Sequence, residues 1–430
     1  MNNETLPIST EKDDPTFVTS EEVDGLQRGG ASGPVQRYCI FKLDENFELF
    51  DRTPNSISIG PIHSETLKLK PMQLVKEKLA SNFSARVGEI IMGDFRNFLI
   101  VNEARIRGSY AYDTSKIASE KLIAIILCDA TFFIELIYKS MGVGDFQNDI
   151  FENNIEKEEV MNELMFLENQ IPLFIHLELC DKCGINIDQF VELFYKLFNM
   201  KDSIGIGLND CTLDLRSEVL HLLDLRRLME MGWVKENKTA TNHVQVDGAT
   251  VLAKYGFKFQ PIKGTMFSFE LSKSCITCLP LFKMPRLYMD VGWELRILNM
   301  MAFEILYFHD TKKMPLCQFM HLLNCLVQNF EDMSLLNNRK VIIVVSSDKD
   351  QVYEKLKDIG RRMKISIRPA ICEELDKAGD DCHVCKAEFR TMFCSCETIR
   401  NLVPGVLPAG TLGAIHHLSL DWLLNRLHLC

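Results

Sequence analysis

The sequence predicts a mainly α-helical protein with small β elements, an α+β chain in which a large helical domain carries a short β-hairpin. Apolar residues recur at helical spacing in most segments between residues 67 and 359. Strict alternation of apolar and polar residues, the strand pattern, is confined to residues 56–59 and 265–282. Helices should therefore supply most of the hydrophobic core.

Glycine and proline suggest where several helices weaken or end. Gly88 and Gly93 weaken the first predicted helix, Gly256 stops another, and Pro172 removes an N–H and should break or kink a third. Pro315 fits the first turn of a helix, where its missing N–H does no harm. The predicted helices span residues 67–98, 115–141, 156–171, 188–198, 213–231, 249–255, 293–307, 315–330 and 347–359.

The second of these helices is the predicted centre of the fold. Ser115 is its expected cap and Gly142 its expected stop. Residues 122–136 are apolar on almost every side, which indicates a buried helix rather than a surface helix. The run is too short, and too interrupted by polar residues, to span a membrane.

The predicted β structure is small. Order is expected to begin at Tyr38, and residues 56–59 should form a short strand that ends at Gly60. Residues 265–282 predict a β-hairpin around a polar turn. Residues 341–345 fit a buried strand or a helix fragment, and periodicity does not decide between the two.

Composition and charge limit the class of protein. The 430 residues are 47% hydrophobic and 25% charged, a globular composition. A net charge of −11 leaves no electrostatic footprint for nucleic acid and no polybasic segment for an anionic membrane surface. The N-terminus has no basic stretch followed by an apolar run, so we expect the 15 cysteines to lie in a reducing compartment, mostly as buried apolar side chains.

Composition shifts along the chain predict four regions. Residues 1–35 form an acidic segment with few large apolar side chains and are expected to be disordered. Residues 36–360 form the helical domain, residues 361–397 a cysteine-rich connecting segment, and residues 398–430 a largely uncharged tail.

Short sequence blocks in a fixed order connect the chain to a known family. These blocks are residues 58–63 (SIGPIH), 129–136 (DATFFIEL), 166–174 (FLENQIPLF), 221–225 (HLLDL), 249–259 and 295–304. Their number and order over residues 37–359 resemble the plant family called domain of unknown function 247. The resemblance implies an uncharacterised plant protein, and members usually end in a transmembrane helix.

The C-terminal tail departs from that expectation. Residues 401–420 carry no formal charge, a stretch long enough to span a bilayer. Pro404, Pro408 and the pair His416-His417 lie inside it, and each breaks a helix or lowers its apolarity. An integral anchor and a peripheral or degraded tail both stay open, so the expected location is membrane-associated at the cytoplasmic face, or cytoplasmic.

Four cysteines in the connecting segment are the best candidate for metal binding. Cys382 and Cys385 are followed, after an eight-residue gap, by Cys394 and Cys396. Four thiolates could bind a structural zinc ion, although this spacing is not a common zinc pattern. The alternative is a cysteine-rich segment without metal, and no other cofactor is predicted.

Two further cysteine pairs have C-x-x-C spacing. Cys180 and Cys183 follow a predicted helix, whereas a redox pair is expected at a helix N-terminus, where the dipole lowers the thiol pKa. Cys275 and Cys278 lie within the predicted hairpin, where positions three apart point to opposite faces. Both pairs are therefore predicted to be structural.

Polar residues inside apolar stretches need partners. Glu168, Asn169 and Gln170 should bond to neighbouring backbone, at a point where Pro172 frees a carbonyl. Asp129 in the central helix should form a hydrogen bond or salt bridge, with Arg226 or Arg227 as the candidate partners.

No catalytic motif is recognisable. His63, His176 and His221 are spread through the chain, and neither a nucleophile elbow nor a phosphate loop is present. We therefore expect a non-enzymatic protein that acts by protein–protein interaction, with partners unknown, no nucleic acid, and association with a membrane through residues 398–430 as an option. One alternative is an enzyme whose pocket gathers Asp129, His176, Glu168 and Asp224. Another is a soluble, zinc-stabilised regulatory protein.

Overall fold

The structure is a computed structural model. It describes residues 38–43, 53–140, 154–200, 215–231, 239, 246–265, 268–273, 279–346, 348–363 and 368–381, with the side chains of 140, 154–156 and 273 left aside. All of them belong to one compact unit, Tyr38–Cys430. The predictions for residues 1–35, and for most of 361–397 and all of 398–430, lie outside the described residues, so the four-region division stays a prediction.

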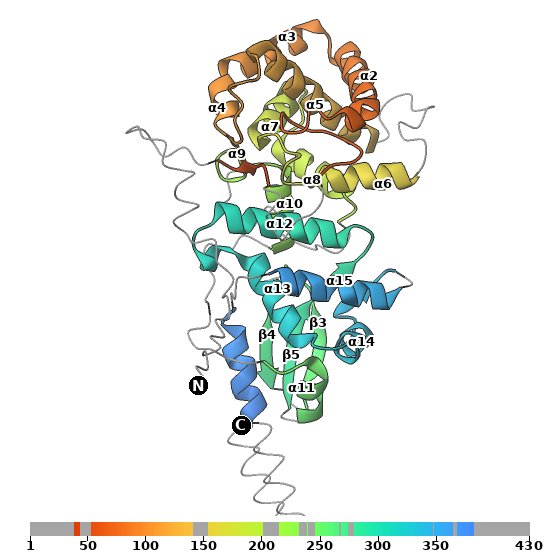
Figure 1. Cartoon of the computed structure of the whole chain (residues 1–430), viewed down its shortest axis with the longest axis vertical. Helices are drawn as coiled ribbons and strands as arrows, with labels where there is room; N and C mark the ends of the chain where they lie inside the picture. The colour runs from red at the N-terminus through yellow and green to blue at the C-terminus, as the bar shows by residue number, and fades with distance from the viewer. Residues whose placement is uncertain are drawn as a thin grey trace, which may run out of the picture. The chain divides into compact units, whose positions relative to one another are not determined.

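The first half of the described chain is helical, as predicted (Figure 1). Gly88, at φ +88°, separates α2 from α3, whereas Gly93 lies inside α3 without breaking it. A 3₁₀ turn, Leu67–Leu69, leads into this group. Its helices are α2 (Lys70–Val87), α3 (Glu89–Val101), α4 (Glu103–Arg107), α5 (Ser119–Ser140), α6 (Asn154–Glu163), α7 (Leu173–Lys182), α8 (Ile187–Leu197), α9 (Leu215–Glu218) and α10 (Leu222–Met231).

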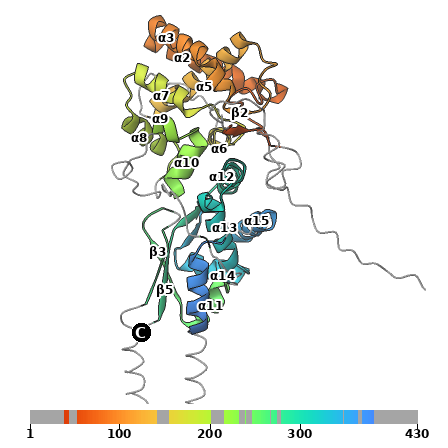
Figure 2. The same ribbon diagram turned by 90° about the vertical axis from the view of Figure 1, so that its left-hand side faces the viewer.

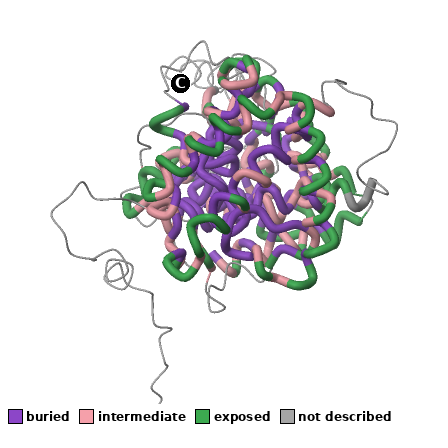
Figure 3. Tube along the Cα trace, turned by 90° about the horizontal axis from the view of Figure 1, so that it is seen from above, coloured by how far each residue is buried: buried purple, intermediate pink, exposed green. Residues whose placement is uncertain are grey.

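Helix α5 is the central helix of this half, as predicted. It packs against α2, α3, α7 and α8, and its residues 129–137 are all buried. Figure 3 shows buried chain filling the middle of the molecule. The helix begins at Ser119 rather than at Ser115, because Asp113 Oδ1 accepts from both the N–H and the hydroxyl of Ser115 and holds that residue in a turn.

The second half combines helices with small sheets (Figure 2). Its helices are α11 (Ala249–Tyr255), α12 (Trp293–Tyr307), α13 (Pro315–Leu326), α14 (Phe330–Asn338) and α15 (Lys349–Arg362), and residues 371–381 are also helical. Its strands are β3 (Lys258–Ile262), β4 (Glu270–Lys273), β5 (Pro280–Pro285), β6 (Leu287–Met289) and β7 (Ile342–Val344). Two short strands, β1 (Ile40–Phe41) and β2 (Tyr110–Ala111), belong to the first half.

The sheets confirm the hairpin and decide the ambiguous strand. Strands β4 and β5 pair antiparallel, with Leu271 opposite Phe282. Strand β3 joins the other edge of β5 in parallel, a pairing that the sequence analysis missed. Residues 342–344 are a strand, because β7 pairs in parallel with β6. Strands β1 and β2 form a second two-stranded parallel sheet.

Four further predictions about the bounds of elements were wrong. Residues 57–59 are not a strand, and the helix predicted to reach residue 171 ends at Glu163. The helix predicted over 213–231 is divided into α9 and α10, and the one predicted over 315–330 ends at Leu326. The first two errors share one cause. Buried side chains form hydrogen bonds with the backbone N–H and carbonyl groups that would otherwise pair within a strand or a helix.

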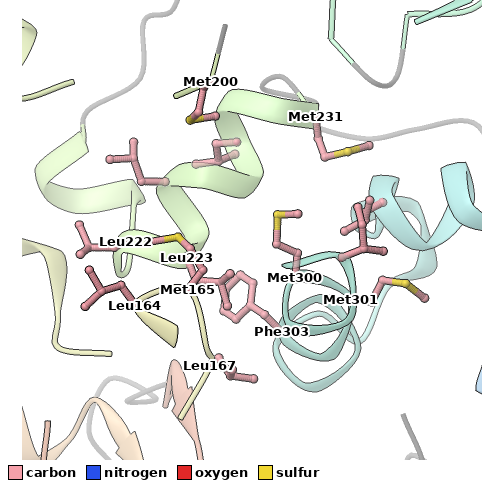
Figure 4. Packing of buried hydrophobic residues seen from close by; sticks show 14 of the residues in the cluster. Leu164, Met165, Leu167, Met200, Leu222, Leu223, Met231, Met300, Met301 and Phe303 are labelled. Carbon is pink, nitrogen blue, oxygen red and sulfur yellow. The ribbon is translucent and has the colours of Figure 1, made fainter. Parts of the chain in front are cut away.

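The core between α10 and α12 is built from leucine, methionine and phenylalanine. Figure 4 shows Leu223 on α10 beside Phe303 of α12, with Met165 from the turn after α6 close by. These residues are all fully buried. Because the turn at 164–171 contributes to this packing, its path is fixed by the same core that joins α10 to α12.

His176 on α7 generates a test of the helical core. Its imidazole lies 4.7 Å, centroid to centroid, from the ring of Phe133 on α5, and neither nitrogen has a hydrogen-bond partner. Burial lowers the pKa of His176 to about 3, against an ordinary value of 6.5. The folded state therefore binds fewer protons than the unfolded state between these two values, and its stability is lost as the pH falls below 6.5.

We expect His176→Leu to stabilise the fold by about 1–3 kcal/mol near neutral pH, because it removes a buried imidazole without partners. It should also remove up to about 1.4 kcal/mol per pH unit of acid sensitivity below pH 6.5. Urea unfolding of both proteins between pH 4 and 7 measures both effects. If the free energy of unfolding of the two proteins changed with pH in the same way, the lowered pKa of His176 would be contradicted.

Candidate functional site

The block at residues 58–63 belongs to a segment whose backbone is held by side chains. Glu163, at the end of α6, accepts the N–H groups of Asn55, Ser56 and Ile57 at 2.7–2.9 Å. Asn169 accepts from the N–H of Ile59 at 2.6 Å. These bonds replace the ladder of a strand, which explains why the alternating residues 56–59 do not form one.

Asn169 completes this arrangement through its amide nitrogen. Its Nδ2 donates to the carbonyl of Ile57 at 2.9 Å and to that of Glu163 at 3.1 Å. The second bond satisfies a carbonyl at the end of α6, so the helix can stop there. Asn169 is 1% exposed, and all its amide bonds run to backbone.

Asp129 and Lys76 form a buried ion pair beneath the same segment. Lys76 on α2 donates to Asp129 on α5 and to the carbonyl of Ser58. Asp129 Oδ2 accepts from the N–H of Gly60 at 2.7 Å. Burial raises the pKa of Asp129, and the Lys76 ammonium opposes that shift.

The partner predicted for Asp129 was wrong. Arg226 pairs with Glu230 at 2.7 Å, and Arg227 pairs with Asp224 at 2.8 Å and with Glu304 at 3.4 Å. The sequence correctly predicted that the buried carboxylate of Asp129 needs a countercharge. Only the packing of α2 against α5 makes Lys76 that partner.

Gly60 has a steric reason to be glycine. Its φ is +75°, and a Cβ atom at this position would lie 2.6 Å from the carbonyl oxygen of Gln170. That carbonyl also accepts from the hydroxyl of Tyr110 at 3.0 Å. The close approach lets the 58–63 and 166–174 blocks lie directly against each other.

Of the remaining members of the polar trio, Gln170 bonds to neighbouring backbone as predicted, whereas Glu168 bonds to backbone far away in the sequence. Glu168 accepts the N–H of Leu43 and pairs with His63 Nε2 at 2.7 Å. Gln170 donates to the carbonyls of Leu164 and Phe166, both at 2.8 Å, and accepts from the N–H of Leu223 at 3.1 Å. The trio thus connects three chain segments, rather than using a carbonyl freed by Pro172.

His221 and Cys39 lie close together but do not form a nucleophilic pair. His221 Nε2 bonds to the carbonyl oxygen of Cys39 at 3.0 Å, and Nδ1 accepts from the N–H of Asp224 at 3.1 Å. The thiol of Cys39 points to the carbonyl of Ser109 at 3.6 Å. Burial raises the pKa of the Cys39 thiol to about 12, so the thiolate needed for attack does not form at neutral pH.

Buried side chains of the 295–304 block also form hydrogen bonds with backbone N–H groups. Asn299 accepts from the N–H of Leu167 at 2.8 Å. Glu304 accepts the N–H groups of Leu316 and Cys317 at the start of α13, at 3.2 and 3.0 Å. Burial raises the pKa of Glu304, with Arg227 opposing the shift. Sequence reasoning singled out neither residue as a buried anchor.

The four side chains that an enzymatic pocket would have gathered have separate partners. Asp129 bonds to Lys76, Glu168 to His63, and Asp224 to Arg227, while His176 lies against Phe133 without a hydrogen bond. Two surface depressions are formed by other residues: Thr250, Glu331, Ser334, Leu335, Asn338 and Arg339 in one, and Asp247, Leu252, Tyr255, Leu375, Asp376, Gly379 and Asp380 in the other.

The predicted zinc ligands Cys382, Cys385, Cys394 and Cys396 lie outside the described residues, so the zinc site stays a prediction. Within the described ranges, no group of three His, Cys, Asp or Glu side chains is placed to hold a metal ion.

The first C-x-x-C pair lacks the lowered thiol pKa that is typical of a redox pair. Cys180 is buried and Cys183 half-buried, both as free thiols, and burial raises the pKa of each. Cys275 and Cys278 lie outside the described residues.

Among the helices that the structure describes, none combines the length and apolarity needed to cross a bilayer. The tail at residues 398–430 is not among them.

Comparisons with known proteins agree with the order of the blocks. A family model described as a plant protein of unknown function, DUF247, matches residues 40–399. The UPF0481 protein At3g47200 of Arabidopsis thaliana is 26% identical over 332 residues, which cover 71% of this chain and 68% of the relative. The putative UPF0481 protein At3g02645 of the same plant is 30% identical over 125 residues, or 29% of this chain and 22% of the relative. No solved structure matches the chain.

Replacing Asn169 tests the structural role of this site. Asn169→Ala removes the partners of one buried N–H and two carbonyls, so we expect a loss of roughly 3–5 kcal/mol in the free energy of unfolding. Urea denaturation measures the loss, with Asn338→Ala, at an exposed helix end, as the matched control. An unchanged midpoint, together with a lost biological activity in plants, would show a functional role instead.

Proposed function

Because the chain belongs to the DUF247 family of plant proteins of unknown function, we propose that it acts through protein–protein contacts and catalyses no reaction. One observation carries the proposal. The polar side chains of the shared blocks, such as Asp129, Asn169 and Glu304, are engaged with backbone groups or countercharges inside the described fold. Groups committed in this way hold the chain together and are not free to turn over a substrate.

Exposed aliphatic side chains support a binding role. Large hydrophobic residues that face solvent are Leu67, Leu74, Ile90, Ile100, Val101, Val291, Phe330 and Val345. The first five lie between the turn at Leu67–Leu69 and the end of α3. Exposed apolar side chains of this kind are available for contact with another protein.

The test compares the full chain with a variant that carries serine at these five positions, using proximity labelling in plant cells. We expect a defined set of proteins to be labelled at least roughly tenfold less by the variant, because each truncated aliphatic removes apolar contact area. Equal thermal stability of both proteins is the control for folding. Identical labelled sets would contradict a binding role for this surface.

We also propose that residues 398–430 associate with a membrane at its cytoplasmic face. The absence of formal charge over residues 401–420 supports this, as does the family's usual C-terminal helix.

Membrane pelleting after an alkaline carbonate wash tests the tail, with the full chain compared to one that ends at Glu397. We expect only the full chain to stay in the pellet, because the uncharged tail supplies the apolar surface. Pelleting of both forms, or of neither, would contradict the role of the tail.

A further inference from the structure

The outer face of α3 combines three exposed aliphatic side chains with charged ones. Ile90 and Val101 are each 82% exposed and Ile100 is 50% exposed, whereas Phe95 and Leu99 on the opposite face are fully buried. Figures 1 and 2 both show α3 at the outer edge, with no described element beyond it. The buried face already fixes the helix to α5 and α7, so the outer aliphatics contribute nothing to that packing.

Gly93 lies between these aliphatics on the same exposed face. A Cβ atom at this position would meet nothing within 4 Å, and its φ is not in the left-handed region. Alanine would therefore favour the helix by about 1 kcal/mol. The single chain has no need of glycine here, and what glycine provides is room for another backbone to approach closely.

Two charges of opposite sign flank Gly93. Glu89 and Arg96 are exposed, and no ion pair or hydrogen bond is recorded for either within the described chain. They lie seven residues apart on the same flank of α3, about 10 Å along the axis, too far to pair with each other. Their midpoint falls next to Gly93.

We propose that α3 is the contact surface of a homodimer, in which the α3 helices of two copies cross antiparallel at Gly93. This inference deepens the proposed function, on which it rests, by naming a second copy of the chain as one partner. A two-fold axis sets each flank of a helix against the same flank of its neighbour. Glu89 then faces the second copy's arginine at position 96, and the reciprocal pair forms on the other side of the axis.

The charges on the outer face of α3 favour a second copy of the chain over a membrane as its binding partner. The outer face carries Glu89 and Asp94 against Arg96, so it has no positive excess that would attract it to an anionic bilayer. A copy of the same helix satisfies both signs at once, because its charges repeat in the reverse order. A single helix pair is a small contact, for which we expect a dissociation constant on the order of 10 µM.

Sedimentation velocity of the purified full chain, over a series of about 1–100 µM, tests the proposal. Glu89→Arg and Arg96→Glu should each weaken the dimer at least roughly tenfold, because each places like charges opposite one another at two symmetric positions. The double variant Glu89→Arg/Arg96→Glu should restore association, since it exchanges the two signs. Gly93→Met should abolish the dimer by keeping the helices apart.

The matched control is Glu331→Arg, which makes the same charge change on α14. It should leave association unaffected, and every variant should keep the thermal melting of the original chain. A protein that stays monomeric throughout the series, or a double variant that stays monomeric, would overturn the proposal.

Two other results would also overturn the homodimer, because they would show that α3 binds something other than a second copy of the chain. One is a monomeric chain whose proximity-labelled partners depend on Ile90, in which case the proposed function stands and the homodimer fails. The other is binding to phosphatidylserine vesicles that is lost in Ile90→Ser.

Discussion

The fold depends on the hydrogen bonding of a segment that has no regular structure of its own. The backbone between Asn55 and Gly60 is bonded by Glu163, Asn169, Asp129 and Lys76, which come from three helices and a turn. A buried N–H or carbonyl without a partner costs about 1–3 kcal/mol, so the fold depends on each of these side chains being in place. The segment in turn fixes how α2, α5 and α6 lie against one another.

The same kind of hydrogen bonding recurs at two other places in the described chain, a turn and the start of a helix. Asn299 holds the turn at Leu167, and Glu304 holds the first turn of α13. Both Asn299 and Glu304 lie within residues 40–399, which the family model matches. In this chain both residues hold backbone groups in place, and membership of the family by itself carries little information about activity.

Many polar side chains thus form hydrogen bonds inside the fold, whereas several large aliphatic side chains are exposed to solvent. A scattered exposed leucine is ordinary, but α3 places Ile90, Ile100 and Val101 around an exposed glycine. All of these residues lie within residues 40–399, which the family model matches.

The sequence by itself determined the helical class, the central helix, the hairpin and the presence of buried polar residues that need partners. Periodicity reports which residues are buried, and Val160, Leu164, Leu167 and Ile171 are all buried. It does not report the path of the chain, so the helix predicted through them ends at Glu163. Only the tertiary structure chose Lys76 for Asp129, because a partner 53 residues away is selected by packing and leaves no local pattern.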